Sequence, residues 1–159
     1  MESLSATAGA TASIEALYRQ EADRLWRALF AFAADPEVAS DAVAESFAQA
    51  IRRGPAIRDP RAWVWKSGFR IAAGELKRRS RSVADIPDGS YLDPEVDSEL
   101  LSALAKLPEG QRAAVVLHYY ADAPVREISR RTGMSQLAVR ANLSRGRKRL
   151  RLLLGDRHG

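Results

Sequence analysis

The chain has 159 residues, 46% of them hydrophobic, which is enough for one ordinary core or for two small helical ones. It contains no cysteine, so disulfide frameworks and thiolate metal sites are excluded. No apolar run approaches the roughly 18 residues of a membrane-spanning helix, and the N-terminus does not resemble a signal peptide. We therefore expect a cytoplasmic protein without membrane insertion, and its formal net charge of +5 favours a polyanionic partner.

The N-terminal stretch, residues 1–13, is rich in Ala, Ser and Thr, and we expect a disordered tail there. Apolar residues from Ile14 to Phe32 then recur at helical spacing, with Ser13 as the expected N-cap. This pattern predicts the first helix.

Two further helices are predicted in the first half of the chain. The pair Asp35-Pro36 ends the first helix and opens a second, from about residue 37 to 53. Within it, Val43 and Phe47 share an apolar face, while Asp41 and Glu45 share the opposite face.

The third helix is expected from Pro60 to about residue 79. Three basic residues fall on one stripe of this helix, which Trp63 borders: Lys66, Arg70 and Lys77. Trp65 and Phe69 fall on a separate apolar face, and core packing is the expected role of each aromatic taken alone. The stripe fits a nucleic-acid surface, with an ordinary solvated cationic face as the alternative.

An acidic segment separates the two halves. Residues 83–96 carry several acids, no Lys or Arg, and the breakers Pro87, Gly89 and Pro94. We interpret this segment as a linker between two small helical domains, which are residues 14–82 and residues 97–155. The expected fold is all-α.

The second half predicts four helices, the last two of them a helix-turn-helix. Short helices are expected at about residues 100–107 and 109–120. A third ends at Gly133, which can adopt the positive φ of a tight turn, and Ser135 then caps a long helix to Leu154. The outer face of that helix fits the DNA major groove.

In this order and spacing, the motifs resemble the extracytoplasmic-function sigma factors of bacterial RNA polymerase, which consist of sigma region two, a linker and sigma region four. The resemblance extends from about residue 14 to 154. It depends on three segments: Asp41-Ala42-Val43-Ala44-Glu45-Ser46-Phe47, Arg58-Asp59-Pro60-Arg61-Ala62-Trp63-Val64-Trp65, and Leu107-Pro108-Glu109-Gly110-Gln111-Arg112 with the helix-turn-helix that follows.

The resemblance implies a three-helix region two, a four-helix region four, and three sets of contacts. The clamp helices of core RNA polymerase would meet Asp41, Glu45 and Phe47. The promoter −10 element would meet Trp63, Lys66, Arg70, Lys77 and Arg78. The −35 element would meet Ser135, Leu137, Ala138, Arg140, Ala141, Ser144, Arg145 and Lys148. The family also implies regulation by an anti-sigma factor.

The chain departs from the family pattern at several of these positions. Ala44 replaces a usual Gln, Arg70 a common Asn, and Phe69 a residue that is often polar. Ala138 and Asn142 replace the usual Thr and basic residue of the recognition helix. These differences concern the promoter sequence more than the family.

Two other classes of function account for less of the sequence. A stand-alone helix-turn-helix regulator would account for residues 97–154, but it leaves the first half unexplained. An enzyme has no support, because His118 and His158 lie in no recognisable metal or nucleophile arrangement. We therefore expect no catalytic residues, no metal site and no cofactor.

Overall fold

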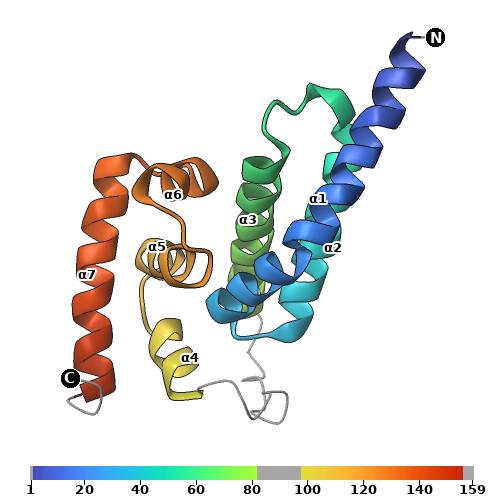
Figure 1. The fold of residues 1–159 in the computed structure, drawn as a ribbon. Coiled ribbons are helices and arrows are strands. Elements are labelled where there is room, and N and C mark those ends of the chain that lie inside the picture. Colours follow the sequence, from blue (N-terminus) through green and yellow to red (C-terminus); the bar gives the residue numbers. More distant parts are fainter. Residues whose placement is uncertain (1, 82–97, 156–159) are drawn as a thin grey trace.

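The computed structural model describes residues 2–81 and 98–155, and in these ranges it is helical with no strand (Figure 1). In chain order the elements are α1 (Glu2–Ala33), α2 (Pro36–Arg53), the 3-10 turn η1 (Gly54–Ala56), α3 (Pro60–Arg81), α4 (Ser98–Ala105), α5 (Glu109–Tyr120), α6 (Val125–Thr132) and α7 (Gln136–Leu154). The expected all-α fold, with three helices before the acidic segment and four after it, is confirmed.

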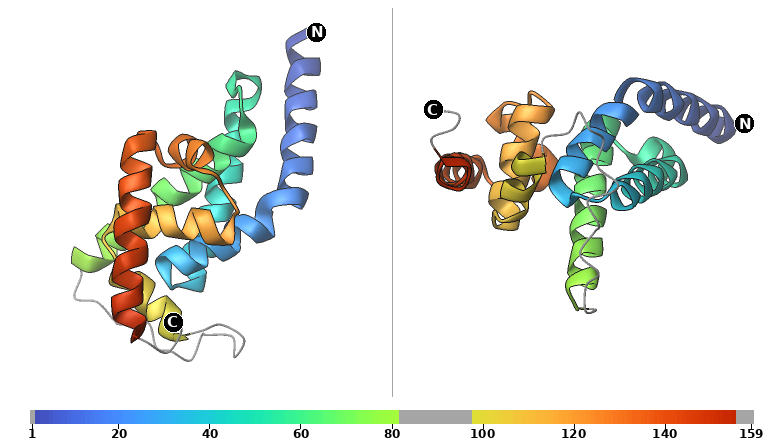
Figure 2. Two further views of the ribbon diagram at one scale, coloured as in Figure 1. Left: turned by 60° about the vertical axis from the view of Figure 1, so that its left-hand side comes forward. Right: turned by 90° about the horizontal axis from the view of Figure 1, so that it is seen from below.

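The expected disordered tail at residues 1–13 is wrong for its described part, because α1 begins at Glu2. Ser13 therefore lies inside a helix and is not an N-cap. Alanine recurs through this stretch and no proline interrupts it, so the segment continues the packed helix that follows it. Its side chains from Leu4 onward are largely exposed, and the helix projects from the body of the molecule (Figures 1 and 2).

The next two helices begin where the prolines predicted. Asp35 caps α2, since its Oδ1 accepts hydrogen bonds from the backbone N–H groups of Glu37 (2.9 Å) and Val38 (3.2 Å). Asp59 acts in the same way at α3, where its Oδ1 accepts from the N–H of Ala62 at 3.1 Å. Both helices carry proline in their first turn, where a missing N–H costs nothing.

The helix-turn-helix has the expected geometry. Gly133 closes α6 in the left-handed region, with φ of 81°, and the Ser135 hydroxyl accepts from the N–H of Ala138 at 3.1 Å. Behind the turn, α7 packs closely on α5 at Gly146, where a Cβ atom would lie 2.7 Å from Cγ2 of Val115. A glycine is needed there for the two helices to approach.

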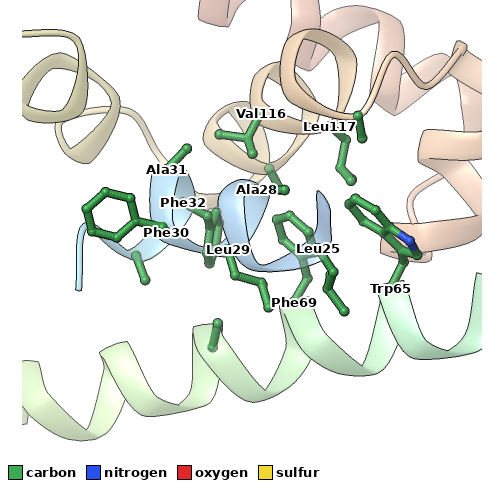
Figure 3. Packing of buried hydrophobic residues seen from close by; sticks show 14 of the residues in the cluster. Leu25, Ala28, Leu29, Phe30, Ala31, Phe32, Trp65, Phe69, Val116 and Leu117 are labelled. Carbon is green, nitrogen blue, oxygen red and sulfur yellow. The ribbon is translucent and has the colours of Figure 1, made fainter. Parts of the chain in front are cut away.

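The two halves of the molecule pack against each other, with α1 and α3 on one side and α5 and α6 on the other. Figure 3 shows buried side chains of α1, α3 and α5 gathered in one cluster: Leu25, Ala28, Leu29, Phe32, Trp65, Phe69, Val116 and Leu117. The sequence did not predict this contact. The acidic segment at residues 83–96 lies outside the described residues, and the division into two domains stays a prediction.

Candidate nucleic-acid interface

The outer face of α7 collects the residues predicted for the −35 element. Leu137 is 77% exposed, and these polar members of the set are also exposed: Ser135, Arg140, Ser144, Arg145 and Lys148. Ala138 and Ala141 are half-buried between them. The opposite face is buried, as the helical periodicity predicted, and consists of Val139, Leu143, Gly146 and Leu150.

This face of α7 is open to solvent. Figure 2 shows α7 at one edge of the molecule, on the far side of α5 and α6 from α1 and α3. An apolar residue as exposed as Leu137, in the first turn of a capped helix and followed by four polar or basic positions, has no packing role. The arrangement suits a surface whose N-terminal end meets base edges while its basic residues meet phosphates.

The basic stripe of α3 lies differently, although its residues are also exposed. Lys66, Arg70 and Lys77 line a cavity of about 440 Å³ between α3 and the helices α5 and α6. At its edge, the Lys77 Nζ atom lies 3.8 Å from a carboxylate oxygen of Glu109. The structure thus brings these three predicted residues together, with the other half of the chain as the facing wall.

The two other residues predicted for the −10 element lie apart from this cavity. Trp63 is half-buried, with the Arg53 guanidinium 6.0 Å from its ring centroid, and it lines a second hollow together with Lys66 and Arg130. Arg78 forms an ion pair with Glu75 on the same helix.

The remaining aromatic residues of α3 belong to the core. Trp65 is fully buried and its indole N–H donates to Glu21 Oε2 at 3.3 Å, while Phe69 packs against Phe32. The expected core role of both is confirmed. Trp63 is therefore the aromatic residue of α3 with surface left for stacking on a base.

The acidic face of α2 carries two of the three predicted polymerase contacts. Asp41 and Glu45 are exposed, and the pKa of Glu45 is lowered by a hydrogen bond from Gln49 and then by one from Arg52. Phe47 is buried, with its ring edge-on to that of Tyr18 at 5.0 Å. It can therefore contribute only by holding α2 in place.

Sequence reasoning missed an apolar groove of about 460 Å³ between α4, α5 and α7. Its lining includes Leu104, Val115 and Leu150, and Tyr119 beside it is 56% exposed. The sequence contains one signal for such a groove, which is the run of three leucines at the end of α7, Leu152 to Leu154. Consecutive residues of a helix point in different directions, so these leucines cannot all face the same core.

Sequence reasoning also missed two arginines that contact the first half of the chain, Arg131, which is buried, and Arg112, which is half-buried. Arginine is usually exposed, so no local pattern marks such positions.

The described residues hold no cluster of three or more side chains suited to a metal ion. His118 lies beside Arg147, with its Nε2 atom 2.9 Å from an arginine Nη atom. Among the same residues, no helix is long and apolar enough to cross a membrane.

Comparison with known proteins gives one consistent result. The family described as Sigma-70, region 4, matches residues 97–150. The chain is 27% identical over 138 residues to the RNA polymerase sigma factor SigV of Bacillus subtilis, covering 81% of this chain and 83% of that protein. It is also 27% identical over 155 residues to the ECF RNA polymerase sigma factor SigE of Mycolicibacterium smegmatis, covering 87% of this chain but only 60% of that one.

Two solved structures share the fold. CnrH, in complex with the cytosolic domain of CnrY, matches with a TM-score of 0.70 at 22% identity, over 95% of this chain and 93% of that one. The sigma factor RpoE of Bartonella quintana, in complex with the anti-sigma factor NepR, matches with a TM-score of 0.73 at 19% identity, over 91% and 99%.

Proposed function

Because this chain belongs to the extracytoplasmic-function sigma factors of bacterial RNA polymerase, we propose that it directs core polymerase to promoters by reading the −35 element with α7 and opening the −10 element with α3. Sigma factors are transcription initiation factors rather than enzymes. The observation that carries the proposal is the exposed face of α7, which presents an apolar residue and several basic ones on a rigid, capped helix.

At the −35 element, α7 enters the major groove with its N-terminal turn foremost. Leu137, Ala138 and Ala141 offer apolar contact to base edges, and Arg140, Ser144, Arg145 and Lys148 offer polar contacts to bases and phosphates. One good bidentate base contact discriminates by about 1–3 kcal/mol, so few such contacts are needed for a preferred sequence.

At the −10 element, the α3 stripe holds the phosphates of the separated strand, and Trp63 acts as a wedge at the fork. The loop of residues 54–60, at the start of α3, meets the base that is turned out. Unstacking a base costs a few kcal/mol. Stacking on an aromatic side chain contributes about 1–3 kcal/mol per base, which is comparable to the free-energy cost of unstacking.

Docking on the polymerase clamp helices is assigned to the acidic face of α2. Asp41 and Glu45 lie four residues apart on an exposed helical face, so their carboxylates can meet basic residues of a partner together. Charge pairs at the rim of such an interface mainly set the encounter rate and the choice of partner.

An anti-sigma factor is the proposed regulator. Two proteins of the same fold are known in complexes, the sigma factor RpoE with the anti-sigma factor NepR, and CnrH with the cytosolic domain of CnrY. The shared fold supports a similar protein partner for this chain, with its own sequence.

The test is run-off transcription with core polymerase and a pool of genomic promoter fragments. We expect defined transcripts that require both proteins and that disappear in the double variant Asp41→Lys, Glu45→Lys. The matched control is Glu15→Lys, Asp23→Lys, which reverses two exposed acids of α1 and should leave transcription unchanged. Specific duplex binding without any polymerase-dependent transcript would contradict the proposal and indicate a stand-alone regulator.

A further inference from the structure

We propose that Glu21 of α1 is a positioning residue for promoter opening, which orients the start of α3 so that Trp63 meets the −10 element. The inference rests on the proposed function and deepens it, because it assigns a role in opening to a side chain that does not itself face DNA. Glu21 is only 5% exposed, and it lies where α1 contacts the first two turns of α3.

Both carboxylate oxygens of Glu21 have a partner on α3. Its Oε2 atom accepts the indole N–H of Trp65 at 3.3 Å, and its Oε1 atom lies 3.0 Å from Nε of Arg61. A buried carboxylate is unfavourable unless it is paired and hydrogen-bonded, and here each oxygen meets a donor. Arg61 also donates to Oε1 of Gln20 at 3.3 Å, so two neighbouring residues of α1 hold the same guanidinium group.

The two partners of Glu21 lie one turn apart on one face of α3. Arg61 and Trp65 are separated by four residues, which brings their side chains to the same side of a helix. At about 100° per residue, Trp63 and Lys66 fall on the opposite side. Glu21 therefore contacts the inner face of the helical segment whose outer face carries residues proposed for the −10 element.

Apolar packing alone would define the orientation of α3 less well. The helices α1 and α3 approach each other closely at Gly68, where a Cβ atom would lie 3.4 Å from Cδ1 of Leu29. Apolar contacts of this kind fix the separation of two helices, but they are not directional. Hydrogen bonds depend on angle as well as distance, so the contacts of Glu21 also fix the rotation of α3 about its axis.

The other contacts at the start of α3 are local. Asp59 accepts the N–H of Ala62 through Oδ1 at 3.1 Å and the N–H of Trp63 through its carbonyl at 3.0 Å. These bonds form the first turn but do not connect it to α1, whereas the contacts of Glu21 do. We therefore expect that loss of the Glu21 carboxylate leaves α3 helical and displaces Trp63 relative to the loop of residues 54–60.

Glu21→Gln is the most informative substitution, because it keeps the size and shape of the side chain. An amide has one acceptor oxygen, and its NH₂ group only donates. It therefore cannot accept from both Trp65 and Arg61, and at one of them a donor faces a donor. Glu15→Gln is the matched control, with the same chemical change at an exposed position of α1.

The first experiment needs no polymerase and records the indole N–H signals of the three tryptophans by ¹⁵N–¹H NMR, assigned with single tryptophan-to-phenylalanine variants. We expect Glu21→Gln to shift the signals of Trp65 and Trp63, and to leave that of Trp26, whose N–H donates to Ser40 at 3.0 Å. Since Trp63 lies on the face of α3 away from Glu21, its shift reports a change of orientation. An unchanged signal of either Trp65 or Trp63 would overturn the inference.

The second experiment measures opening by the reconstituted polymerase on a promoter identified by run-off transcription. 2-Aminopurine is placed at each position of the −10 element in turn, because its fluorescence rises when the base is unstacked. We expect Glu21→Gln to lower the opening equilibrium constant roughly tenfold, which corresponds to losing part of one base–aromatic stacking contact. Affinity for core polymerase and for a −35 duplex should be unchanged, and Glu15→Gln should behave like the parent.

Arg61→Met tests the same contact from its other side. It removes the guanidinium group from a side chain that is half exposed, so the fold should tolerate it. We expect a similar loss of opening and a shifted Trp63 signal, with the double variant Glu21→Gln, Arg61→Met no worse than the more impaired single variant, because both act on one contact. Additive losses would overturn the inference. If circular dichroism finds Glu21→Gln unfolded, the Trp63 signal and the opening of Arg61→Met decide alone.

The outcomes separate this inference from the function on which it rests. Equal opening by the parent and by Glu21→Gln would overturn the inference and leave the proposed function intact. A joint loss of opening and of core binding would also overturn it, because Glu21 would then only support the fold. Failure of the parent chain to open any promoter would contradict the proposed function, and the inference with it.

Discussion

The outer face of α7 and the basic stripe of α3 have similar sequence patterns, but they have different surroundings in the fold. Each is a row of basic residues on one side of a helix whose other side is buried. Figure 1 shows α7 at one edge of the molecule, whereas the residues of the α3 stripe line a cavity together with residues of α5 and α6. Periodicity determines which side of a helix is polar, and tertiary packing determines whether that side is available to a ligand.

This difference implies an order of binding. With the two halves packed as they are, we expect duplex DNA to meet the exposed face of α7 before it meets the α3 stripe, which lines a cavity with α5 and α6. Reversing charges on each helix in turn should therefore have unequal effects in the free chain and equal effects on transcription.

The largest expected effect is on duplex binding. The pair Arg145→Glu, Lys148→Glu should weaken binding of a random-sequence duplex by roughly a hundredfold at low salt, because phosphate contacts are replaced by repulsion. The pair Lys66→Glu, Arg70→Glu should change it little. Fluorescence anisotropy across a salt series measures both, and run-off transcription should fail with either pair. Equal loss of duplex binding would mean that the two surfaces are equally available.

A smaller effect, on the free energy of unfolding, is expected when glycines of α7 and α3 are replaced by alanine. Gly146→Ala forces a methyl group against Val115, and overpacking of this kind costs about 1–3 kcal/mol of the free energy of unfolding. Gly74→Ala on α3 is the control, because its Cβ would meet nothing within 4 Å, and it should stabilise by about 0.4–1 kcal/mol. Urea unfolding measures both, and a neutral Gly146→Ala would refute the close packing of α7 on α5.

The smallest effect concerns the caps at the start of the two helices. Ser135→Ala and Asp59→Ala each remove a side-chain acceptor for a first-turn N–H, which should cost about 1 kcal/mol. Ser144→Ala, at an exposed position inside α7, should stay within about 0.5 kcal/mol of the parent. Thermal unfolding compares them, and a Ser135→Ala value no larger than that of Ser144→Ala would contradict the cap.

Local signals predicted the helices well. The bounds expected for the last helix agree with α7, because Ser135 begins it and the buried residues recur at helical spacing up to Leu150. Pro36 and Pro60 likewise placed the starts of α2 and α3. The start of α1 was missed because composition was taken as a sign of disorder, although alanine is also the strongest helix former.

The candidate site was only partly predictable, for a related reason. Helical periodicity placed Leu137 and Arg145 on the open side of α7 and Trp65 in the core. It could not show that Arg131 stacks on Trp65 or that Arg112 caps α1, because each contact joins segments far apart in the chain. The local sequence around an arginine does not indicate which aromatic ring its guanidinium group will contact.

The apolar cluster of Figure 3 affects how long the protein stays soluble and intact in a cell. If the two halves separated, Val116 and Leu117 would no longer pack against Ala28 and Phe32. Both halves would then expose apolar surface. A surplus of opened chain without polymerase is therefore expected to aggregate or to be degraded by proteases. The amount of soluble chain that a cell can hold without polymerase then depends on how stably the two halves pack against each other, and not on how well α3 and α7 bind DNA.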